Sequence, residues 1–383
     1  MKKICSLILL GLILLLGTWL RFRDLHLPRE MYFDEVYHVP TIDLIAHDDP
    51  RAFEWWHQEL TTEYGTGTYV DWLHPPLAKL IQAFSLKAFG LHPWSWRAPS
   101  ALAGVLLILV VYSLARELWG PQSWASLIAA LLASIDGLAL TMSRIAMNDI
   151  FLTLWCALAV FFFWRWWRAN RETDWWLWTL GASFALASKW TGIFLWGFFG
   201  TWLLIDHRFS PAFHRRASQK WWQLVTSVLV AVLVYLFAYL PLFHYHDWSH
   251  FLELHEQILS YQLGLDATHP FASPAWMWPW GFKSVLWYAD DNAGIQIWER
   301  PFYFSWYFCL GCLFVSFFWL SSRQLGKERP QFTYLLLAYF WLWAPWLFSP
   351  RILFLHHYLP ALPFLWVLSG RVFEKICCST DKV

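Results

Sequence analysis

Apolar residues occur along this chain in runs long enough to cross a lipid bilayer, and short polar connections separate most of these runs. Since a helix of about 20 residues crosses roughly 30 Å of hydrocarbon, the pattern predicts an all-α polytopic membrane protein with about ten transmembrane helices. Residues 1–383 are expected to form one membrane domain, because no internal repeat or low-complexity linker divides them. The predicted spans are 4–20, 98–116, 122–141, 148–167, 174–189, 190–206, 222–242, 303–320, 331–349 and 352–371.

The distribution of Lys and Arg predicts the orientation. Most of these residues lie in short connections on the side of the N-terminus, and few lie in the two long polar segments 21–97 and 243–302. Cytoplasmic loops are the ones that accumulate positive charge. Both termini are therefore expected inside the cell, and the two long segments are expected to be non-cytoplasmic loops.

Both loops contain recognisable elements. In the first, LAKLIQAFSLKAFG (77–90) has apolar positions at helical spacing together with Lys79 and Lys87, which predicts a helix lying in the membrane interface. In the second, SPAWMWPWGF (273–282) is dense in Trp and Pro, which favours an aromatic platform at the membrane surface.

Composition agrees with a membrane protein and excludes some partners. Hydrophobic residues make up 58% and charged residues 14%, whereas soluble domains carry about 25% charge. A net charge of +1 without a long basic run argues against nucleic acid. None of the six cysteines lies in the long loops, so no disulfide framework is expected. Cys309 and Cys312 form a CxxC inside an apolar helix, where packing is the favoured interpretation.

The candidate chemistry begins with the acidic pair Asp34-Glu35, which follows the first apolar run. Adjacent residues do not share one face of a helix or strand, so the pair does not fit a two-carboxylate glycosidase. One acid could accept a proton while its neighbour binds a donor or a cation. Transfer from a phosphate-linked donor requires only a base, because the phosphate leaves as a stable anion. The alternative without catalysis is a solvated turn or a helix N-cap.

Cations are needed to hold such a phosphate. Arg97, Arg144, Lys189 and Arg351 all lie at predicted outer helix ends, where snorkelling to lipid headgroups is the competing interpretation. Lys189, at the junction of two short spans, is the hardest to explain by snorkelling. Asp149 could help shape the site, although pairing with Arg144 is the favoured interpretation.

Several histidines also lie on the outer side. His74 precedes two prolines that enforce an extended segment, so His74, with Lys79 after it, is expected to position the site. His357, beside His356, could face the phosphate or the headgroups. The histidines of 244–255 lack a metal-binding motif, and no metal or cofactor is expected.

The order of motifs resembles that of the protein O-mannosyltransferases over most of the chain. The motifs are FDEVYH (33–38), DWLHPPLAKL (71–80), WRAPSALAG (96–104), SRIAMNDIFLTLW (143–155), SKWTGIFLW (188–196) and PRILFLHHYLPALPF (350–364). The resemblance implies a GT-C fold and inverting transfer of mannose from a polyprenyl phosphate to Ser or Thr of translocated proteins. It implies no metal.

The resemblance also implies roles for individual residues. Asp34 would be the catalytic base, and Glu35 a site residue near the donor or the acceptor. Arg97 matches a family arginine tied to activity, and Arg21 matches another beyond the first span. Lys189 would lie near the donor phosphate.

The chain departs from the family pattern in its second long loop. This loop has about 60 residues, which leaves no room for the β-trefoil insertion of eukaryotic members. Lys283-Ser284 replaces the usual Arg-Pro of the family, and DNAGIQIWERP (291–301) stands where a Gly-Asn-Pro element is expected. These departures favour a compact enzyme of the bacterial plasma membrane, with its active site on the non-cytoplasmic face. They leave open the sugar, the acceptor proteins and whether the protein forms a dimer.

Three alternatives remain at this level. A related polyprenyl-phosphate sugar transferase would modify lipid A or another envelope glycan. A transporter or flippase would have ionisable residues through the membrane midplane, whereas here they gather at one face. A structural scaffold would tolerate Asp34→Asn.

Overall fold

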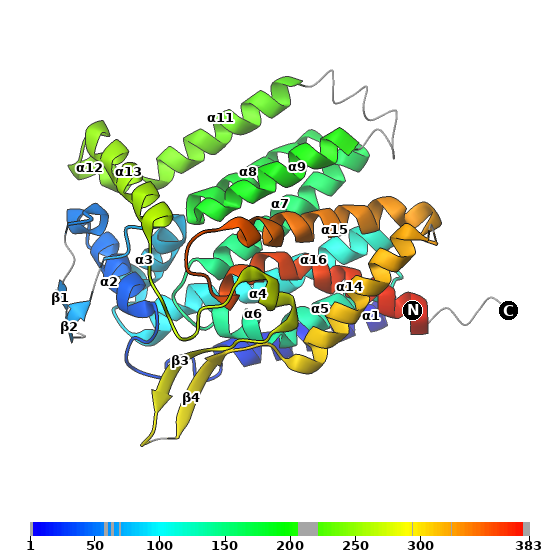
Figure 1. Cartoon of the computed structure of the whole chain (residues 1–383), viewed down its shortest axis with the longest axis horizontal. Helices are drawn as coiled ribbons and strands as arrows, with labels where there is room; N and C mark the ends of the chain where they lie inside the picture. Colours follow the sequence, from blue (N-terminus) through cyan, green and yellow to red (C-terminus); the bar gives the residue numbers. More distant parts are fainter. Residues whose placement is uncertain are drawn as a thin grey trace.

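The computed structural model describes residues 3–56, 60–62, 65–68, 70–205, 221–292, 294–322 and 324–377. Long helices run side by side as a bundle, and the smaller elements gather at one end of it (Figure 1). The long helices are α1 (Lys3–Phe22), α4 (Pro93–Trp119), α5 (Ala125–Ile135), α7 (Asp149–Ala169), α8 (Glu172–Ser188), α9 (Phe194–Ile205), α11 (Trp221–Ala238), α14 (Tyr303–Ser321), α15 (Arg329–Trp343) and α16 (Leu362–Cys377).

The two long polar segments, 21–97 and 243–302, are built mainly of short helices and two hairpins. The first segment contains α2 (Glu35–Ala46), η1 (Pro50–Phe53), β1 (Leu60–Thr62), β2 (Gly65–Thr68) and α3 (Leu77–Phe89). The second contains α12 (Leu240–Tyr245), α13 (Trp248–Gly264), η4 (Ala275–Trp280), β3 (Val285–Asp290) and β4 (Ile295–Glu299). Each strand pair is antiparallel, and in the second hairpin Val285 faces Glu299. Further short elements are α6 (Gly137–Met142), η2 (Trp190–Ile193), η5 (Gly326–Glu328), η6 (Ala344–Phe348) and η7 (Leu355–Ala361).

Helices occur in each predicted span. In the described part of the chain, four of them (α1, α4, α7 and α14) are long and apolar enough to cross a membrane by themselves, and the count of ten spans stays a prediction. Several predicted spans are interrupted. The span 122–141 breaks at Asp136, whose carboxylate accepts a hydrogen bond from Ala139 N and caps α6. The last span begins as the 3-10 helix η7, which contains Pro360, and becomes α-helical only at Leu362.

Close helix contacts depend on small residues. An added Cβ at Gly370 of α16 would lie 2.4 Å from the carbonyl oxygen of Ala125 in α5. At Gly181 of α8 it would lie 3.1 Å from the backbone nitrogen of Ala159 in α7. Without a hydrophobic driving force between helices in lipid, such close backbone packing is a main source of association.

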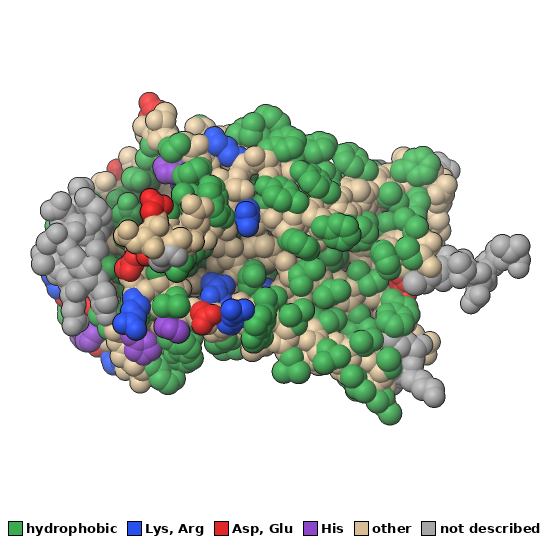
Figure 2. All heavy atoms as spheres, turned by 90° about the horizontal axis from the view of Figure 1, so that it is seen from below, with side chains coloured by type: hydrophobic (Ala, Val, Ile, Leu, Met, Phe, Trp, Pro, Cys, Tyr) green, Lys and Arg blue, Asp and Glu red, His purple; other side chains and the backbone are tan. Residues whose placement is uncertain are grey.

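Charged side chains gather toward one end of the molecule, whereas the rest of the visible face is largely apolar (Figure 2). The charged end is the end with α2, α3 and the two hairpins (Figure 1). Helix α1 begins and helix α16 ends at the opposite end (Figure 1). This arrangement agrees with two termini on one side of a membrane and the polar segments on the other.

Candidate active site

A cavity of about 370 Å³ lies at the charged end of the bundle, where α2, the start of α7, the junction between α8 and η2, and η7 meet. These elements come from four distant parts of the chain. Most of the polar wall is ionisable: Asp34, His38, His74, Asp149, Lys189, His269, Arg351, His356 and His357. Six of the residues selected from the sequence therefore meet in one cavity, namely Asp34, His74, Asp149, Lys189, Arg351 and His357.

Asp34 occupies the N-cap position of α2, yet its carboxylate caps no backbone N–H group. Its half-buried side chain lines the cavity and makes no hydrogen bond or ion pair with a described residue. Burial raises the pKa of Asp34 to about 6; His356 opposes this shift and Asp71 adds to it. A carboxylate in this setting can take a proton from a bound hydroxyl group near neutral pH.

Glu35 points away from the cavity. Its fully buried carboxylate accepts hydrogen bonds from Arg97 Nε (2.8 Å) and Nη2 (2.6 Å), and from the backbone nitrogen of Ala146 (3.1 Å). Arg97 also donates to the carbonyl oxygens of Leu25, Pro28 and Glu30. This fixed pair anchors the residue after Asp34 to α4.

The position of Arg97 is at odds with direct contact to a donor phosphate, because its side chain is 0% exposed and does not line the cavity. Arg21 and Arg144 do not line it either. Arg21 donates to the carbonyl oxygens of Gly17, Ala133 and Ser134, and Arg144 to those of Leu20 and Arg21. These arginines bind backbone carbonyl groups and thereby hold helix ends together.

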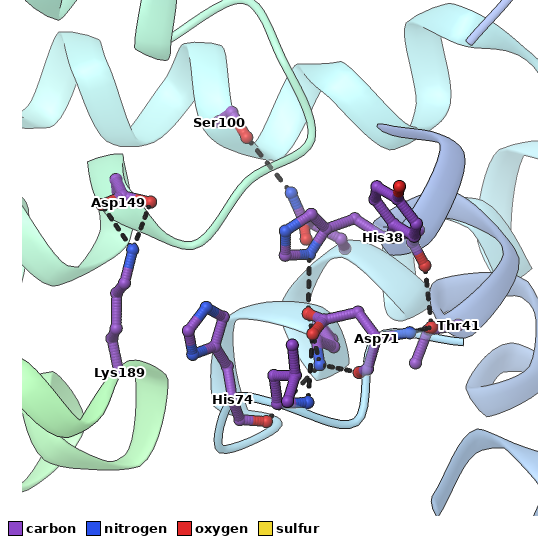
Figure 3. Close-up of polar contacts among 11 residues, drawn as sticks. His38, Thr41, Asp71, His74, Ser100, Asp149 and Lys189 are labelled. Atoms are coloured by element: carbon purple, nitrogen blue, oxygen red, sulfur yellow. Dashed lines mark hydrogen bonds and ion pairs between the residues drawn. The ribbon is translucent and has the colours of Figure 1, made fainter. Parts of the chain in front are cut away.

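Lys189 reaches the cavity from the junction between α8 and η2. Its Nζ lies 2.8 and 2.9 Å from the two carboxylate oxygens of Asp149, at the start of α7 (Figure 3). The expected pairing of Asp149 with Arg144 is therefore wrong: Arg144 extends toward the end of α1, while the α8 junction brings Lys189 to Asp149. The pair fixes the lysine at the cavity wall.

Arg351 provides the second cation. Its half-buried side chain lines this cavity and a neighbouring one, and within the described residues it forms no ion pair. Its Nε donates a long hydrogen bond to the carbonyl oxygen of Ile352, at 3.4 Å. His357 lies near it on the cavity wall, with its ring stacked on His356 at 4.5 Å. An anion in the cavity would therefore meet one cation, Arg351, that is not in an ion pair with any described carboxylate.

A buried polar cluster around Asp71 includes His38 and lies beside His74, two residues that line the cavity (Figure 3). Asp71 Oδ2 lies 2.8 Å from Lys79 Nζ and 3.2 Å from His38 Nδ1, and Asp71 N donates to Thr41 Oγ1 (2.7 Å). Lys79 also contacts the carbonyl oxygens of Asp71 and His74. Lys79 is thus buried, not directed to headgroups, and it fixes the segment that carries His74 between α2 and α3.

The electrostatics of the Asp71 cluster follow from its burial. Burial lowers the pKa of His38 to about 4 and that of His74 to about 3, so both imidazoles face the cavity uncharged. Burial by itself would raise the pKa of Asp71, but the ammonium group of Lys79 holds it below its ordinary value. Asp71 and Lys79 therefore form an ion pair beneath two neutral hydrogen-bonding rings.

Sequence reasoning missed Glu299, the last residue of β4. Its carboxylate is fully buried, accepts a hydrogen bond from Trp287 Nε1 (2.9 Å) and lies 3.1 Å from His356 Nδ1. The only sequence signal was an acid at the end of the apolar strand IQIWE. Among the described residues, no group of three or more His, Cys, Asp or Glu could hold a metal ion.

Two family models match the chain. Residues 73–239 match the model described as dolichyl-phosphate-mannose-protein mannosyltransferase, and residues 247–383 match the C-terminal four TMM region of protein-O-mannosyltransferase.

Curated relatives include two bacterial proteins named polyprenol-phosphate-mannose–protein mannosyltransferase. The Corynebacterium glutamicum protein is 31% identical over 198 residues, covering 44% of this chain and 35% of the relative. The Mycolicibacterium smegmatis protein is 24% identical over 347 residues, covering 74% of this chain and 64% of the relative. The chain thus spans between about a third and two thirds of the length of these relatives.

Solved structures share the fold. The Saccharomyces cerevisiae protein O-mannosyltransferase Pmt1-Pmt2 complex bound to the sugar donor aligns with a TM-score of 0.80 and 14% identity, covering 100% of this chain and 86% of that one. ArnT from Cupriavidus metallidurans bound to undecaprenyl phosphate aligns with a TM-score of 0.67 and 15% identity, covering 98% and 61%. With helices, motifs and both family models in agreement, this chain belongs to the protein O-mannosyltransferase family of GT-C membrane glycosyltransferases.

Proposed function

We propose that this protein transfers mannose from a polyprenyl-phosphate carrier to Ser or Thr hydroxyl groups of translocated proteins, with inversion at the anomeric carbon. The observation that carries the proposal is one cavity containing a carboxylate without a described partner, Asp34, together with two cations, Lys189 and Arg351. Base and anion-binding groups are the two requirements for transfer from a phosphate-linked sugar. The names of the curated relatives support the choice of donor and acceptor.

The residues of the cavity would act as follows. The acceptor hydroxyl group gives its proton to Asp34 as its oxygen bonds to the anomeric carbon of the sugar. The bond between that carbon and the phosphate oxygen breaks, and the phosphate leaves with the electron pair. Lys189 and Arg351 bind the phosphate as its negative charge increases. Arg97 and Glu35, which lie outside the cavity, fix the start of α2 and so position Asp34.

An apolar groove beside this cavity suits the polyprenyl chain of the donor. The groove has a volume of about 790 Å³ and lies between α8, η2, α11 and α13. Trp190, which directly follows Lys189, forms part of its wall. A carrier with its chain in this groove would bring its phosphate to the Lys189 end, so that one bound molecule would reach both sites.

The same proposal places the protein in a bacterial plasma membrane, with the cavity on the non-cytoplasmic face. Support comes from the charged end of the bundle, which lies opposite the start of α1 and the end of α16 (Figures 1 and 2). Two bacterial relatives also support it. The yeast structure is a Pmt1-Pmt2 complex, so a dimer is one candidate for the oligomeric state of this protein, which its mass in detergent would measure.

The test uses purified protein with polyprenyl-phosphate mannose labelled in the sugar. We expect label on a Ser/Thr-containing peptide from a secreted protein, with α-linked product if the β-linked donor is supplied. An equimolar lipid A acceptor and an Ala-for-Ser/Thr peptide serve as comparisons. Label on lipid A alone would assign the protein to the envelope-glycan class, and no donor consumption with any acceptor would refute a transferase.

A further inference from the structure

Glu299 is a buried acid outside the cavity, and the mechanism above does not use it. It ends strand β4 and pairs across the hairpin with Val285. Its Oε2 atom accepts a hydrogen bond from Trp287 Nε1 and lies 3.1 Å from Nδ1 of His356, which lines the cavity. His356 is therefore the side chain that connects Glu299 to the reacting groups.

A carboxylate removed from water requires a compensating charge. Within the described residues, His356 is the basic group at ion-pair distance from Glu299, whereas the neighbouring Arg300 is exposed. The pair is almost fully buried, with 5% of the His356 side chain and none of the Glu299 side chain exposed. This arrangement favours an imidazolium that donates Nδ1–H to Glu299. The opposite edge of the ring, with Nε2, is then left for the cavity.

The Glu299 carboxylate also binds Trp287, whose ring packs against Phe33, the residue before Asp34. Trp287 stacks on Phe33, with ring centres 4.8 Å apart and an interplanar angle of 13°. Phe33 in turn meets the ring of His356 edge-on at 6.1 Å. Glu299 thus binds two rings that contact Phe33, so it fixes His356 in relation to Asp34.

We propose that Glu299 is a positioning residue, which keeps a protonated His356 facing Asp34 and thereby favours the ionised, proton-accepting form of that carboxylate. The inference rests on the proposed function, since it assigns a task in the same reaction. It adds a residue that touches neither the sugar nor the phosphate.

The other charges around Asp34 define the background for this effect. Burial raises the pKa of Asp34 to about 6, His356 from η7 and Lys189 from the α8 junction oppose this shift, and Asp71 and Asp149 reinforce it. His356 itself is also close to Asp149, Lys189 and His357. Among the charged groups around His356 in the described residues, Glu299 is the one within hydrogen-bonding distance of its ring. Removing its charge should therefore act on Asp34 through His356.

The experiment is the pH profile of mannose transfer by Glu299→Gln. Glutamine keeps the shape and can still accept a hydrogen bond from Trp287, but it has no charge to hold the imidazolium. We expect the acidic limb of kcat/KM to move upward by roughly one pH unit, with a rate near that of the unmodified protein at high pH. The matched control is Glu30→Gln, since Glu30 accepts a hydrogen bond from Tyr288 (2.6 Å) on the same hairpin without contacting His356.

A second variant keeps the test decisive if Glu299→Gln does not fold. His356→Gln should move the acidic limb in the same direction, and the double variant should show no further shift beyond His356→Gln. An unchanged limb in both single variants, or additive shifts in the double variant, would overturn the inference. Absence of transfer by the unmodified protein would instead refute the proposed function, so the two failures are distinct.

Discussion

Two neighbouring carboxylates differ in this protein because the start of α2 directs their side chains into different surroundings. Asp34 lines a cavity with cations, while Glu35 is enclosed by Arg97 and the backbone of Ala146. Chemical similarity between the two acids is therefore a poor guide to their roles. Burial and partners separate a residue that can accept a proton from one whose charge is already bound.

Asp34→Asn is expected to reduce transfer by about 10²–10⁴-fold, because the amide cannot take the acceptor proton. Donor binding should persist, since Lys189 and Arg351 are unchanged. The measurement is transfer rate together with donor affinity by a direct binding assay. Asp24→Asn is the matched control, as Asp24 is exposed and pairs with Arg23 on the surface. Transfer retained by Asp34→Asn would remove the carboxylate from the mechanism.

Two arginines should give different phenotypes. Arg351→Ala should raise the KM for the donor about tenfold to a hundredfold, which corresponds to loss of one hydrogen bond to a charged group, and leave Tm nearly unchanged. Arg97→Gln should lower Tm, because breaking a buried ion pair costs about 3–5 kcal/mol. Donor kinetics and thermal unfolding in detergent are measured on both. A raised KM for the donor with an unchanged Tm in Arg97→Gln would instead indicate that Arg97 binds the donor phosphate.

Sequence alone could select Asp34 and Lys189 as candidates, because an acid in the first long polar segment and a lysine at the junction of two apolar spans both require an explanation. It could not determine that Arg97 binds Glu35, since the two residues are 62 positions apart and an arginine at a helix end also suits a phosphate. Glu299 was missed for a similar reason. Its partner His356 is 57 positions away, and only the folded hairpin brings them together.

Helix positions followed from the apolar pattern, whereas helix interruptions did not. Helices α4, α7 and α14 lie where the hydrophobic runs predicted them. The breaks at Asp136 and before Leu362 depend on a side-chain cap and on proline, and these local effects leave the overall hydropathy unchanged. The two long polar segments illustrate the same limit. Their polarity was evident, but α2 and α13 depend on a shared hydrophobic cluster, and the β3–β4 hairpin depends on packing against the bundle core.

The contact between two helices can be tested with Gly370→Ala, which should push α16 away from α5. The new methyl group would meet the carbonyl oxygen of Ala125, and overpacking of this kind costs about 1–3 kcal/mol. Gly200→Ala is the control, because among the described residues no atom beyond its own stretch of α9 lies within 4 Å of the added Cβ, and alanine is the better helix former. Tm in detergent should fall for the first variant and stay equal or rise for the second. Equal Tm values would contradict the close contact.

Polarity varies along the bundle axis. On the face seen in Figure 2, charged side chains gather toward the end with the cavity, and the rest of that face is largely apolar. This distribution agrees with the proposed orientation, which has the cavity at one membrane surface and the start of α1 and the end of α16 at the other. In that proposal, donor and acceptor meet on the non-cytoplasmic side.

Cysteine labelling tests this orientation. A cysteine introduced at Asp291, in the exposed turn between β3 and β4, should react with an impermeant maleimide in right-side-out vesicles. The native exposed Cys377 at the end of α16 should react only after the vesicles are opened. Each site is measured with the other cysteine replaced by serine, and with Cys378 replaced in both. The opposite pattern would place the cavity in the cytoplasm.

The anchoring of Glu35 by Arg97 also limits how the acidic motif can change. If the order of the pair were reversed to Glu-Asp, the shorter side chain would fall about one methylene short of the guanidinium group, while the longer one would crowd the space meant for substrate. Two replacements that preserve net charge and composition would thus damage both the scaffold and the chemistry. The order of the two acids therefore matters, because each position requires a particular side-chain length as well as a carboxylate.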